Sequence, residues 1–521
     1  MKPEMSCKPN TSLPSGAASV NQSFTRRSTE PARYQRNVPS FLQVVKFGGT
    51  SIGDAHCIQK VIDIIRSYAG KGELVVVVSA MAGVTNKLIE AAAESAAQHR
   101  EKAACILAAL RTKHDLAVHT LLPSTPERNR IDRRIRELFE ECEGWCENIA
   151  QTGNLTPQIR DLISSLGERL SAPMVAAALT AQGVPSEPIE ATELVVTDDY
   201  YGSADPKMEL TQERCEERLR PLLRCGVIPI VTGFIGATED GVLTTLGRGG
   251  SDYSATIIGA ALGADEVTIW TDVDGILTAD PHLVPAARTI PEISYREAAE
   301  LAHFGAKVLH PKTLRPVVQS GIPVWIRNTF APEKSGTKIT PGGHSNAVGV
   351  KGLAAVNDAA LITLSGHDLS CVPDVISRTK ATAASIRTEV LMICHSPACN
   401  HVCLVVAAAA APQIVDALRR EFASEARHGA GHDVTVDSTV AVLTLVGQDL
   451  HVARSVVGRA VDELNRENVN ILATAQGSSE CNVSFVVPRK DVKTALATTH
   501  REFQLCLLNV PSECGAEVQA L

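Results

Sequence analysis

The sequence predicts an α/β protein: a mostly parallel β-sheet sandwiched between helices, with a helical insertion, followed by two ferredoxin-like α+β modules. Three observations predict this fold. Continuous valine runs are bounded by helical segments, which is typical of a parallel sheet covered on both faces. A long helical stretch interrupts the strands, and an internal repeat occupies the C-terminal part.

The first 40 residues are rich in Ser, Thr, Pro and Asn and contain four arginines, Arg26, Arg27, Arg33 and Arg36. This composition predicts a disordered tail over residues 1–40. A transit peptide has a related composition, so an organellar address stays open beside a cytoplasmic location. No apolar segment of a secretory signal is present.

The predicted catalytic domain covers residues 41–340. We expect a strand at 42–47, a helix at 55–69 and a strand at "ELVVVVSA", and then mostly helix from Lys87 to Gln182. Further strands are expected at "PSEPIEA", "VIPIVTGFIGA", "EVTIWTDVDG" and "GIPVWIRN".

The repeat pairs "LITLSGHDL" with "VLTLVGQDL" at an offset of 447 − 366 = 81 residues, counted from Gly366 and Gly447. The same offset pairs Arg378 with Arg459. A constant offset indicates two copies of one unit without net insertion. Each copy reads strand, helix, strand, strand, helix, which predicts modules at 347–425 and 433–507 and a short tail at 508–521.

Composition excludes several classes of function. The chain has 521 residues, 44% hydrophobic and 21% charged, with a net charge of −8. No long basic run follows the N-terminal tail, so we expect no nucleic-acid partner. No apolar run reaches the roughly 18 residues of a membrane span, so we expect a soluble protein without a membrane partner. Fourteen scattered cysteines favour reduced thiols over a disulfide framework.

One cysteine cluster, "CHSPACNHVC", places Cys394, Cys399 and Cys403 beside His395 and His401. Its spacing matches no common zinc pattern, and strand alternation would send several of these side chains to opposite faces. We therefore expect no metal site.

The stretch "VVKFGGTSIGD" places Lys46 before Gly48 and Gly49, so it is not a Walker loop, in which the lysine follows the glycines. The glycines allow close backbone approach, and Thr50 or Ser51 can cap a helix that begins near Ala55. Such a helix start suits an anion. On these residues alone, a phosphate loop and a plain strand-to-helix turn both remain open.

Two further stretches have polar side chains next to glycines. "TTLGRGGSDYSA" surrounds Arg248 with glycines and ends in Ser251 and Asp252, which suits an anionic ligand or a flexible capped turn. "WTDVDG" places Asp272 and Asp274 just after a strand, as ligands of Mg²⁺ near phosphates or as turn residues. Lys307 in "FGAKVLHP" adds a second cation.

Six motifs, "KFGGTS", "SAMAGVTN", "SLGERLSA", "GFIG…TTLGRGGSDYSA", "WTDVDG" and "FGAKVLHPKT", occur in the order and spacing of the aspartate kinases of the amino-acid kinase family. The C-terminal pair of modules resembles their ACT domains, and the resemblance covers roughly residues 42–505. It implies ATP-dependent phosphorylation of the side-chain carboxylate of L-aspartate to 4-phospho-L-aspartate, the first step toward lysine, threonine and methionine. It also implies Mg²⁺, a lysine or threonine effector, and a homodimer or larger homo-oligomer formed through the ACT modules.

The resemblance assigns roles to residues that match its motifs. Lys46, Arg248 and Asp252 form the expected catalytic set. The expected aspartate-binding residues are Thr85, Glu168, Arg248 and Ser251. The expected nucleotide-binding residues are Lys46, Gly48, Gly49, Thr271, Asp272, Leu277, His282 and Lys307, and the expected effector residues are Gln476, Ser478, Ser479 and Asn482.

The sequence departs from the family pattern at two sites. Leu277 and His282 stand where an aromatic residue and an arginine are frequent, which predicts looser ATP binding. The first ACT copy has Pro397 and Ala398 in place of the two serines of the second copy. We therefore expect unequal effector contacts from the two copies.

Two other functions remain as alternatives. Another amino-acid or carboxylate kinase of the same fold is one, although "LGERLSA" and the paired ACT modules argue against it. An effector-binding subunit of weak catalytic activity is the other, and the presence of Lys46, Glu168, Arg248 and Asp252 argues against it.

Overall fold

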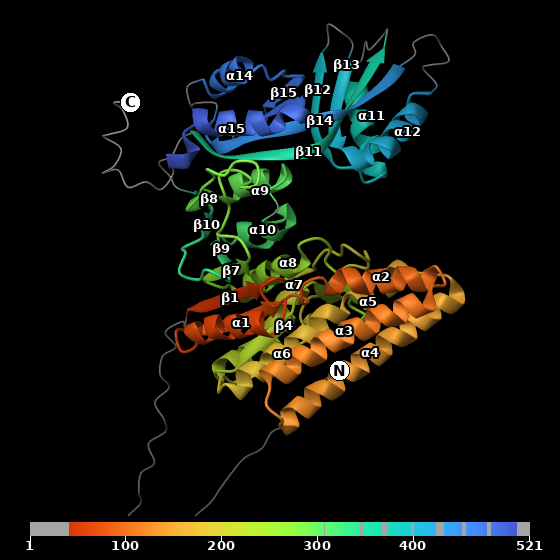
Figure 1. Cartoon of the computed structure of the whole chain (residues 1–521), viewed down its shortest axis with the longest axis vertical. Helices are drawn as coiled ribbons and strands as arrows, with labels where there is room; N and C mark the ends of the chain where they lie inside the picture. Colours follow the sequence, from red (N-terminus) through yellow and green to blue (C-terminus); the bar gives the residue numbers. More distant parts are fainter. Residues whose placement is uncertain are drawn as a thin grey trace, which may run out of the picture. The chain divides into compact units, whose positions relative to one another are not determined.

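The computed structural model describes residues 41–306, 308–343, 349–366, 372–396, 401–423, 432–450, 455–476 and 481–507 (Figure 1). Residues 1–40 and 508–521, for which tails were predicted, lie outside this description. So do Lys307, Pro397, Ala398, Cys399, Ser478 and Ser479.

An eight-stranded sheet forms the first half of the described chain, with the order β3-β4-β2-β1-β7-β9-β10-β8. All neighbouring strands are parallel except β9 and β10, which confirms the mostly parallel sheet. The strands are β1 (Leu42–Phe47), β2 (Glu73–Val78), β3 (Ser186–Ile189), β4 (Ile228–Thr232), β7 (Glu266–Thr271), β8 (Glu292–Ser294), β9 (Val324–Asn328) and β10 (Thr337–Thr340).

Helices cover both faces of this sheet, because strand side chains alternate between two apolar clusters. Val45 and Phe47 of β1 pack with α1 (Ala55–Tyr68) and α6 (Leu166–Ala181). Val44 points the other way and packs with α7 (Met208–Arg224) and α8 (Gly250–Leu262). The predicted sandwich is therefore confirmed.

The helical insertion is confirmed as well. It comprises α2 (Val84–Ala96), α3 (Arg100–Leu121), α4 (Pro126–Thr152), α5 (Pro157–Ser164) and α6. Pro126 and Pro157 stand in the first turns of their helices, where a missing N–H costs nothing, and Thr125 and Thr156 cap them. A small antiparallel hairpin, β5 (Ile235–Ala237) and β6 (Leu243–Thr245), follows β4.

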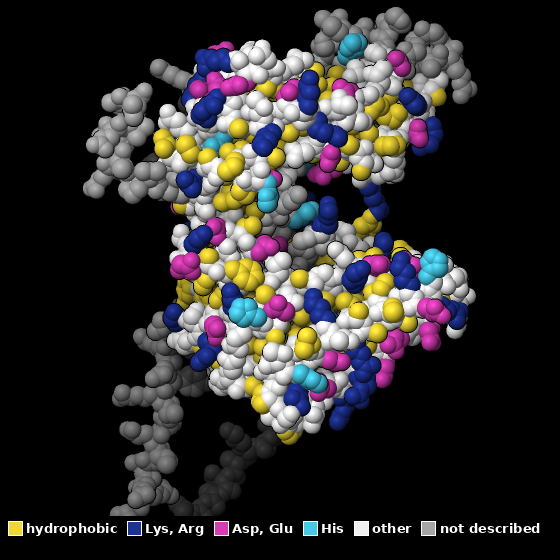
Figure 2. Space-filling view, in the orientation of Figure 1, with side chains coloured by type: hydrophobic (Ala, Val, Ile, Leu, Met, Phe, Trp, Pro, Cys, Tyr) yellow, Lys and Arg dark blue, Asp and Glu magenta, His cyan; other side chains and the backbone are white. Residues whose placement is uncertain are grey.

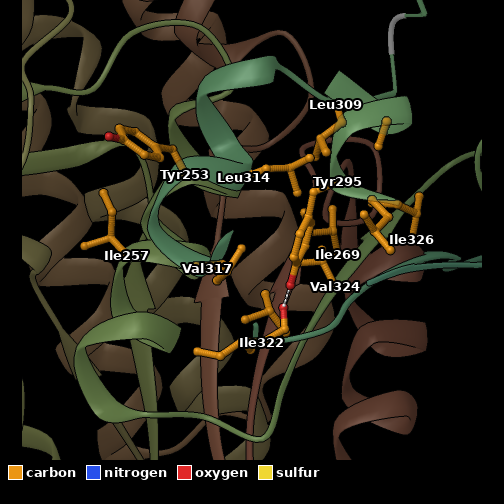
Figure 3. Close-up of a cluster of buried hydrophobic side chains, with 14 of the residues drawn as sticks. Tyr253, Ile257, Ile269, Tyr295, Leu309, Leu314, Val317, Ile322, Val324 and Ile326 are labelled. Carbon is orange, nitrogen blue, oxygen red and sulfur yellow. Dashed lines mark hydrogen bonds between the residues drawn. The ribbon is translucent and has the colours of Figure 1, made fainter. Parts of the chain in front are cut away.

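Two short helices, α9 (Tyr295–His303) and α10 (Pro311–Val318), complete this part of the core. Figure 3 shows Tyr295 standing among Leu314, Val317 and Val324, with its hydroxyl donating a hydrogen bond to the Ile322 carbonyl. The ring is thus buried without leaving its polar atom unsatisfied.

The 81-residue repeat is confirmed by the element boundaries. The first copy contains β11 (Gly349–Gly366), α11 (Val372–Ser385), β12 (Val390–Ser396), β13 (His401–Ala407) and α12 (Ala411–Glu421). The second contains β14 (His432–Gln448), α14 (Val456–Arg466), β15 (Ala473–Gln476), β16 (Asn482–Pro488) and α15 (Val492–Glu502). β16 and α15 begin and end 81 residues after β13 and α12.

The two copies share one six-stranded sheet, β12-β13-β11-β14-β16-β15. β11 and β14 are long antiparallel neighbours whose register runs from Gly349 opposite Gln448 to Gly366 opposite His432. The first half of β11 therefore extends the sheet of the second copy, and the first half of β14 extends that of the first copy. This exchange supplies each copy with a fourth strand.

The C-terminal modules contact the segment that follows β7. Thr278 and His500 share a buried hydrogen bond of 2.9 Å between Oγ1 and Nε2, and the Leu353 N–H donates to the Thr278 carbonyl. Ala279 and Val284 belong to the apolar cluster of the second copy.

On the face shown in Figure 2, lysine and arginine side chains lie among aspartates and glutamates, without forming one basic patch. Within the described residues, no helix is long and apolar enough to cross a membrane.

Candidate active site

The turn after β1 brings Lys46 and two glycines to the carboxyl end of the sheet. Lys46 is buried, with 6% of its surface exposed. The Gly48 N–H donates to the Trp270 carbonyl at 3.0 Å, and a Cβ on Gly49 would lie 2.9 Å from the Ala80 carbonyl oxygen. Gly49 therefore lies so close to the turn after β2 that a side chain would collide, while the backbone of Gly48 is bonded to β7.

The predicted cap of the next helix was wrong. Asp54 is the N-cap of α1, and its carboxylate accepts the Cys57 N–H at 2.8 Å. Ser51 is buried instead, with its hydroxyl 2.7 Å from that of Thr329 and also directed at the Trp270 carbonyl. Because Ser51 belongs to a turn that precedes the helix by three residues, its hydroxyl ties this turn to the sheet rather than to α1.

Lys46 forms a buried ion pair with Asp252 in the first turn of α8. Lys46 Nζ lies 2.5 Å from Asp252 Oδ1, and the two side chains are 8% and 15% exposed. A carboxylate in the first turn of a helix is stabilised by the helix dipole, so Asp252 has two favourable partners. The pair holds the lysine ammonium at the mouth of the site.

Glu168, on the first turn of α6, is a further titratable group of the site. It is 3% exposed, and burial raises its pKa to about 8, against the smaller lowering effects of backbone N–H groups, Ser251 and Lys46. The Ser251 hydroxyl donates to Oε1 at 3.4 Å. Within the described structure, Oε2 has no hydrogen-bond partner. A buried carboxylate with a free oxygen is suited to receive a cationic donor.

A cavity of about 330 Å³ unites these groups. Its walls come from the turn after β1, the turn after β2, α6, Phe234 and the start of α8. Six predicted site residues line it: Lys46, Gly49, Thr85, Glu168, Ser251 and Asp252.

Two helices begin at this cavity without a side-chain cap. α2 starts after Gly83, and α8 starts after Gly249; both glycines have positive φ angles, 78° and 67°. No side chain accepts the first N–H groups of either helix; the Val84 and Gly250 N–H groups donate to the Met81 and Gly247 carbonyls, and residues at the start of both helices line the cavity. Uncapped helix N-termini attract anions through their N–H groups and dipoles. The cavity therefore combines two anion-binding ends, a lysine and a buried carboxylate.

Arg248 does not line this cavity. It is exposed and lies between Gly247 and Gly249, whose φ angles are 81° and 67°. Its two neighbours, Gly247 and Gly249, line the cavity wall, so Arg248 lies beside the cavity without lining it.

Asp161 is a positioning residue that the sequence reasoning missed. It is buried, and its carboxylate accepts the N–H and the hydroxyl of Thr245, both at 2.8 Å, and the Gly202 N–H at 2.9 Å. Burial raises its pKa. It thus anchors the strand that leads into the loop around Arg248. An acidic residue among apolar Ile159 and Ile163 was the only signal.

Four of the predicted nucleotide-binding residues lie outside this cavity, in the segment at and after the end of β7: Thr271, Asp272, Leu277 and His282. The Thr271 hydroxyl donates to Asp272 at 3.2 Å. Leu277 forms a β-bridge with Thr289, and His282 is exposed in the turn after Asp280, whose carboxylate accepts its N–H. None of these residues lines the 330 Å³ cavity.

Asp274, the other carboxylate of "WTDVDG", already has partners. Its oxygens lie 2.6 Å from the Asn328 amide and from the Lys334 ammonium, which hold its pKa below the usual value. Among the residues described, no group of three or more His, Cys, Asp or Glu side chains could hold a metal ion.

Comparison with known proteins agrees with this architecture. The sequence model described as "Amino acid kinase family" matches residues 42–328, more than half of the chain, and the one described as "ACT domain" matches residues 443–503. The fold and site thus define an amino acid kinase with a C-terminal regulatory-type module.

Three similar proteins show which group of amino acid kinases this chain resembles. The bifunctional aspartokinase/homoserine dehydrogenase of Haemophilus influenzae is 31% identical over 88% of this chain and 56% of its own length. Aspartokinase 1, chloroplastic, of Arabidopsis thaliana is 30% identical over 88% of this chain and 80% of its own length. Aspartokinase III of E. coli, solved with aspartate and ADP, is 32% identical over 89% of this chain and 100% of that chain, with a TM-score of 0.76.

A second structure of that E. coli protein, in complex with lysine and aspartate, has a TM-score of 0.71 and covers 89% of this chain and 99% of that one. The chain spans about half the length of the bifunctional relatives that it matches. The chain belongs to the aspartokinases of the amino acid kinase family.

Proposed function

We propose that this chain transfers the terminal phosphoryl group of ATP to the side-chain carboxylate of L-aspartate, giving 4-phospho-L-aspartate, the first step toward lysine, threonine and methionine. The observation that carries the proposal is the buried Glu168 with its unpartnered oxygen, in the same cavity as Lys46 and the N-termini of two helices that lack a side-chain cap. This arrangement complements a small zwitterion, with one ammonium and two carboxylates.

The chemistry fits these groups. A carboxylate is already a nucleophile, so no general base is required. Glu168 receives the substrate ammonium, and the Ser251 hydroxyl and the helix N-termini orient its carboxylates. Lys46 neutralises charge on the transferring phosphoryl group, while Asp252 holds its ammonium in place. Thr85 lines the same wall and contributes a hydroxyl to the substrate.

Magnesium would arrive with the nucleotide rather than at a protein cage. Asp272 is the carboxylate at the end of β7 without a cationic partner in the described structure, since Asp274 is paired with Lys334. One carboxylate plus phosphate oxygens is a usual way to hold Mg²⁺. The ion would neutralise charge on the phosphates, and Thr271, Leu277, His282 and Gly48 would contact the nucleotide.

The test is an assay of the full chain with Mg-ATP, L-aspartate or L-glutamate, and hydroxylamine, which traps an acyl phosphate. We expect hydroxamate with aspartate and none above background with glutamate. Hydroxamate from glutamate alone would favour another carboxylate kinase. No product from either, in a folded protein that still binds an amino acid, would favour an effector-binding subunit.

Replacing Arg248 with lysine tests whether Arg248 binds a carboxylate of aspartate. Lysine keeps the charge but loses the two-pronged contact with a carboxylate, so we expect the aspartate KM to rise about tenfold with the ATP KM nearly unchanged. Arg136→Lys, an exposed exchange on α4, serves as the control. An unchanged aspartate KM would remove Arg248 from the site.

We further propose that the ACT modules bind lysine or threonine as a feedback effector, through Gln476, Ser478, Ser479 and Asn482. Gln476 is exposed at the end of β15. The Asn482 amide donates to Glu300 of α9 at 2.5 Å and so links β16 to the helix beside the catalytic sheet. An effector that engages Asn482 would compete with this contact. Inhibition requires preferential binding to the less active conformation.

The effector proposal predicts that Asn482→Ala raises the inhibitory concentration of the effective amino acid about tenfold, because one hydrogen bond to a charged ligand is lost. Lysine and threonine are titrated singly and together against wild type and variant. Asn470→Ala, on the exposed segment before β15, is the control. Unchanged inhibition in Asn482→Ala would exclude this residue from the effector site.

We also propose a homodimer formed through the ACT modules and a cytoplasmic location. ACT modules associate side by side, and the sheet has an edge strand at each end, β12 and β15, that can accept a neighbour. Light scattering of the full chain measures the mass directly.

A further inference from the structure

Cys394 and Cys403 stand directly opposite each other on adjacent strands of the first ACT copy. β12 and β13 are antiparallel, and their register pairs Ile393 with Leu404, Cys394 with Cys403 and His395 with Val402. Side chains opposite each other on antiparallel strands point to the same face. The sequence reasoning, which followed alternation along one strand, did not place these two thiols together.

This strand register is compatible with the Cα separation that a disulfide requires. Directly opposed residues on antiparallel strands have Cα atoms about 4.5–5.5 Å apart. Disulfides form at Cα separations of about 4.4–6.8 Å. The two thiols are in hydrogen-bond contact, and both cysteines are free.

The surroundings of the pair favour one thiolate. The Cys394 thiol donates to the Cys403 sulfur and lowers the pKa of Cys403, and the Thr363 hydroxyl, 3.6 Å from that sulfur, adds to the effect. The pKa of Cys394 is raised correspondingly. The thiolate is the nucleophilic form of cysteine, so Cys403 is the attacking group and Cys394 the resolving group.

Partial exposure distinguishes this pair from a second pair in the chain. Cys394 and Cys403 are both partly exposed. Cys142 and Cys146 also share a thiol hydrogen bond, but they lie one turn apart on α4 and are both buried. A dissolved oxidant can reach the first pair without unfolding of the chain, whereas the second pair is enclosed in the helical core.

We propose that Cys394 and Cys403 form a reversible, two-electron redox site that a hydroperoxide closes to a cross-strand disulfide and a dithiol reopens. In the first step the Cys403 thiolate attacks the terminal peroxide oxygen; an S–O bond forms, the O–O bond breaks, and the departing alkoxide, or hydroxide when the oxidant is hydrogen peroxide, is protonated to an alcohol or to water. In the second step the Cys394 sulfur attacks Cys403; the S–S bond forms, the S–O bond breaks, and the Cys394 proton leaves with hydroxide as water. Sulfur is oxidised and the peroxide is reduced.

The experiment uses the full chain carrying Cys399→Ser, because the tryptic fragment 388–419 then contains only Cys394 and Cys403. The protein is treated with hydrogen peroxide, alkylated and digested with trypsin, and the masses of the fragments are measured by mass spectrometry. We expect the fragment to lose two hydrogens and to resist alkylation. Oxidation of this pair should be at least about tenfold faster than oxidation of Cys142 and Cys146, measured as the loss of alkylation at those two residues. Dithiothreitol should restore both free thiols.

Two variants in the same background, Cys394→Ser and Cys403→Ser, isolate the pair. Each should retain a folded circular dichroism spectrum and lose the two-hydrogen product, while Cys403→Ser should also slow peroxide consumption at this fragment. If both thiols stay fully alkylated in the folded protein while exposed Cys105 and Cys225 are oxidised, the proposal is wrong. Loss of two hydrogens in either single-thiol variant would likewise refute it.

Discussion

Lys46→Met is expected to lower kcat by about three orders of magnitude or more, with a folded protein. In the proposed mechanism the lysine supplies a positive charge at the point where the phosphoryl group transfers, and a charge that acts in the transition state affects kcat rather than binding alone. Its ammonium is buried and held by Asp252 at 2.5 Å, so water cannot replace it without reorganisation. Steady-state kinetics with aspartate and Mg-ATP measure the effect.

The buried pair calls for two controls. Lys46→Met leaves Asp252 without its partner, which destabilises the fold by up to about 3–5 kcal/mol. The double variant Lys46→Met, Asp252→Asn removes both charges and should recover thermal stability but not turnover. Lys87→Met on α2, where the lysine is exposed and paired with Glu90, should behave as wild type. Near-normal turnover in folded Lys46→Met would show that the turn after β1 is a plain strand-to-helix turn and not a phosphate-binding loop.

Glu168→Gln is expected to raise the aspartate KM by at least about 30-fold, equivalent to ~2 kcal/mol, because the amide cannot form a buried ion pair with the substrate ammonium. The ATP KM should change little. Glu140→Gln, an exposed exchange on α4, is the matched control. An unchanged aspartate KM would show that the ammonium binds elsewhere.

The pH dependence gives an independent check. Burial raises the pKa of Glu168 to about 8, so the free enzyme holds it mostly neutral at pH 7 and ionised above pH 8. In the proposed mechanism, the ammonium group of aspartate binds to the ionised form of Glu168. Wild-type kcat/KM for aspartate should therefore rise with pH up to about 8 and then level off, and Glu168→Gln should lack this rise.

The contribution of Glu168 to stability should fall as pH rises, whereas kcat/KM for aspartate rises. An acid whose pKa is raised by folding contributes stability that is fully present below its ordinary pKa of 4.5 and is lost as pH rises through about 8. Glutamine does not titrate. Relative to wild type, Glu168→Gln should therefore gain stability between pH 5 and pH 9, which thermal unfolding at the two pH values measures. If the difference in stability between Glu168→Gln and wild type is the same at pH 5 and at pH 9, the raised pKa is contradicted.

Much of the fold followed from local patterns. The valine runs of β1 and β2 are buried on both faces, which is why they read as continuous rather than alternating strands. The 81-residue offset was read correctly because β13 and α12 recur without insertion as β16 and α15. The offset did not predict that β11 and β14 pair with each other and extend each other's sheet, because a sequence repeat carries no information about strand pairing.

The candidate site was predicted in part. Motif order located six residues that line one cavity, but local chemistry misassigned the cap of α1, since Asp54 and Ser51 are equally good cap residues by type. Asp161 escaped notice because its partners, Thr245 and Gly202, follow it by 84 and 41 residues. Arg248 matched its motif, yet the structure places its two neighbouring glycines and not Arg248 itself in the cavity wall.

By itself, the sequence determined the order of elements, the repeat and the residue types at the site, because periodicity, turn residues and motif spacing are local properties. Only the tertiary structure decided which groups act together and with what acidity. Burial sets the pKa of Glu168, and strand register places Cys394 opposite Cys403. Both depend on segments far apart in the chain, whose contacts arise when apolar faces pack and exclude water.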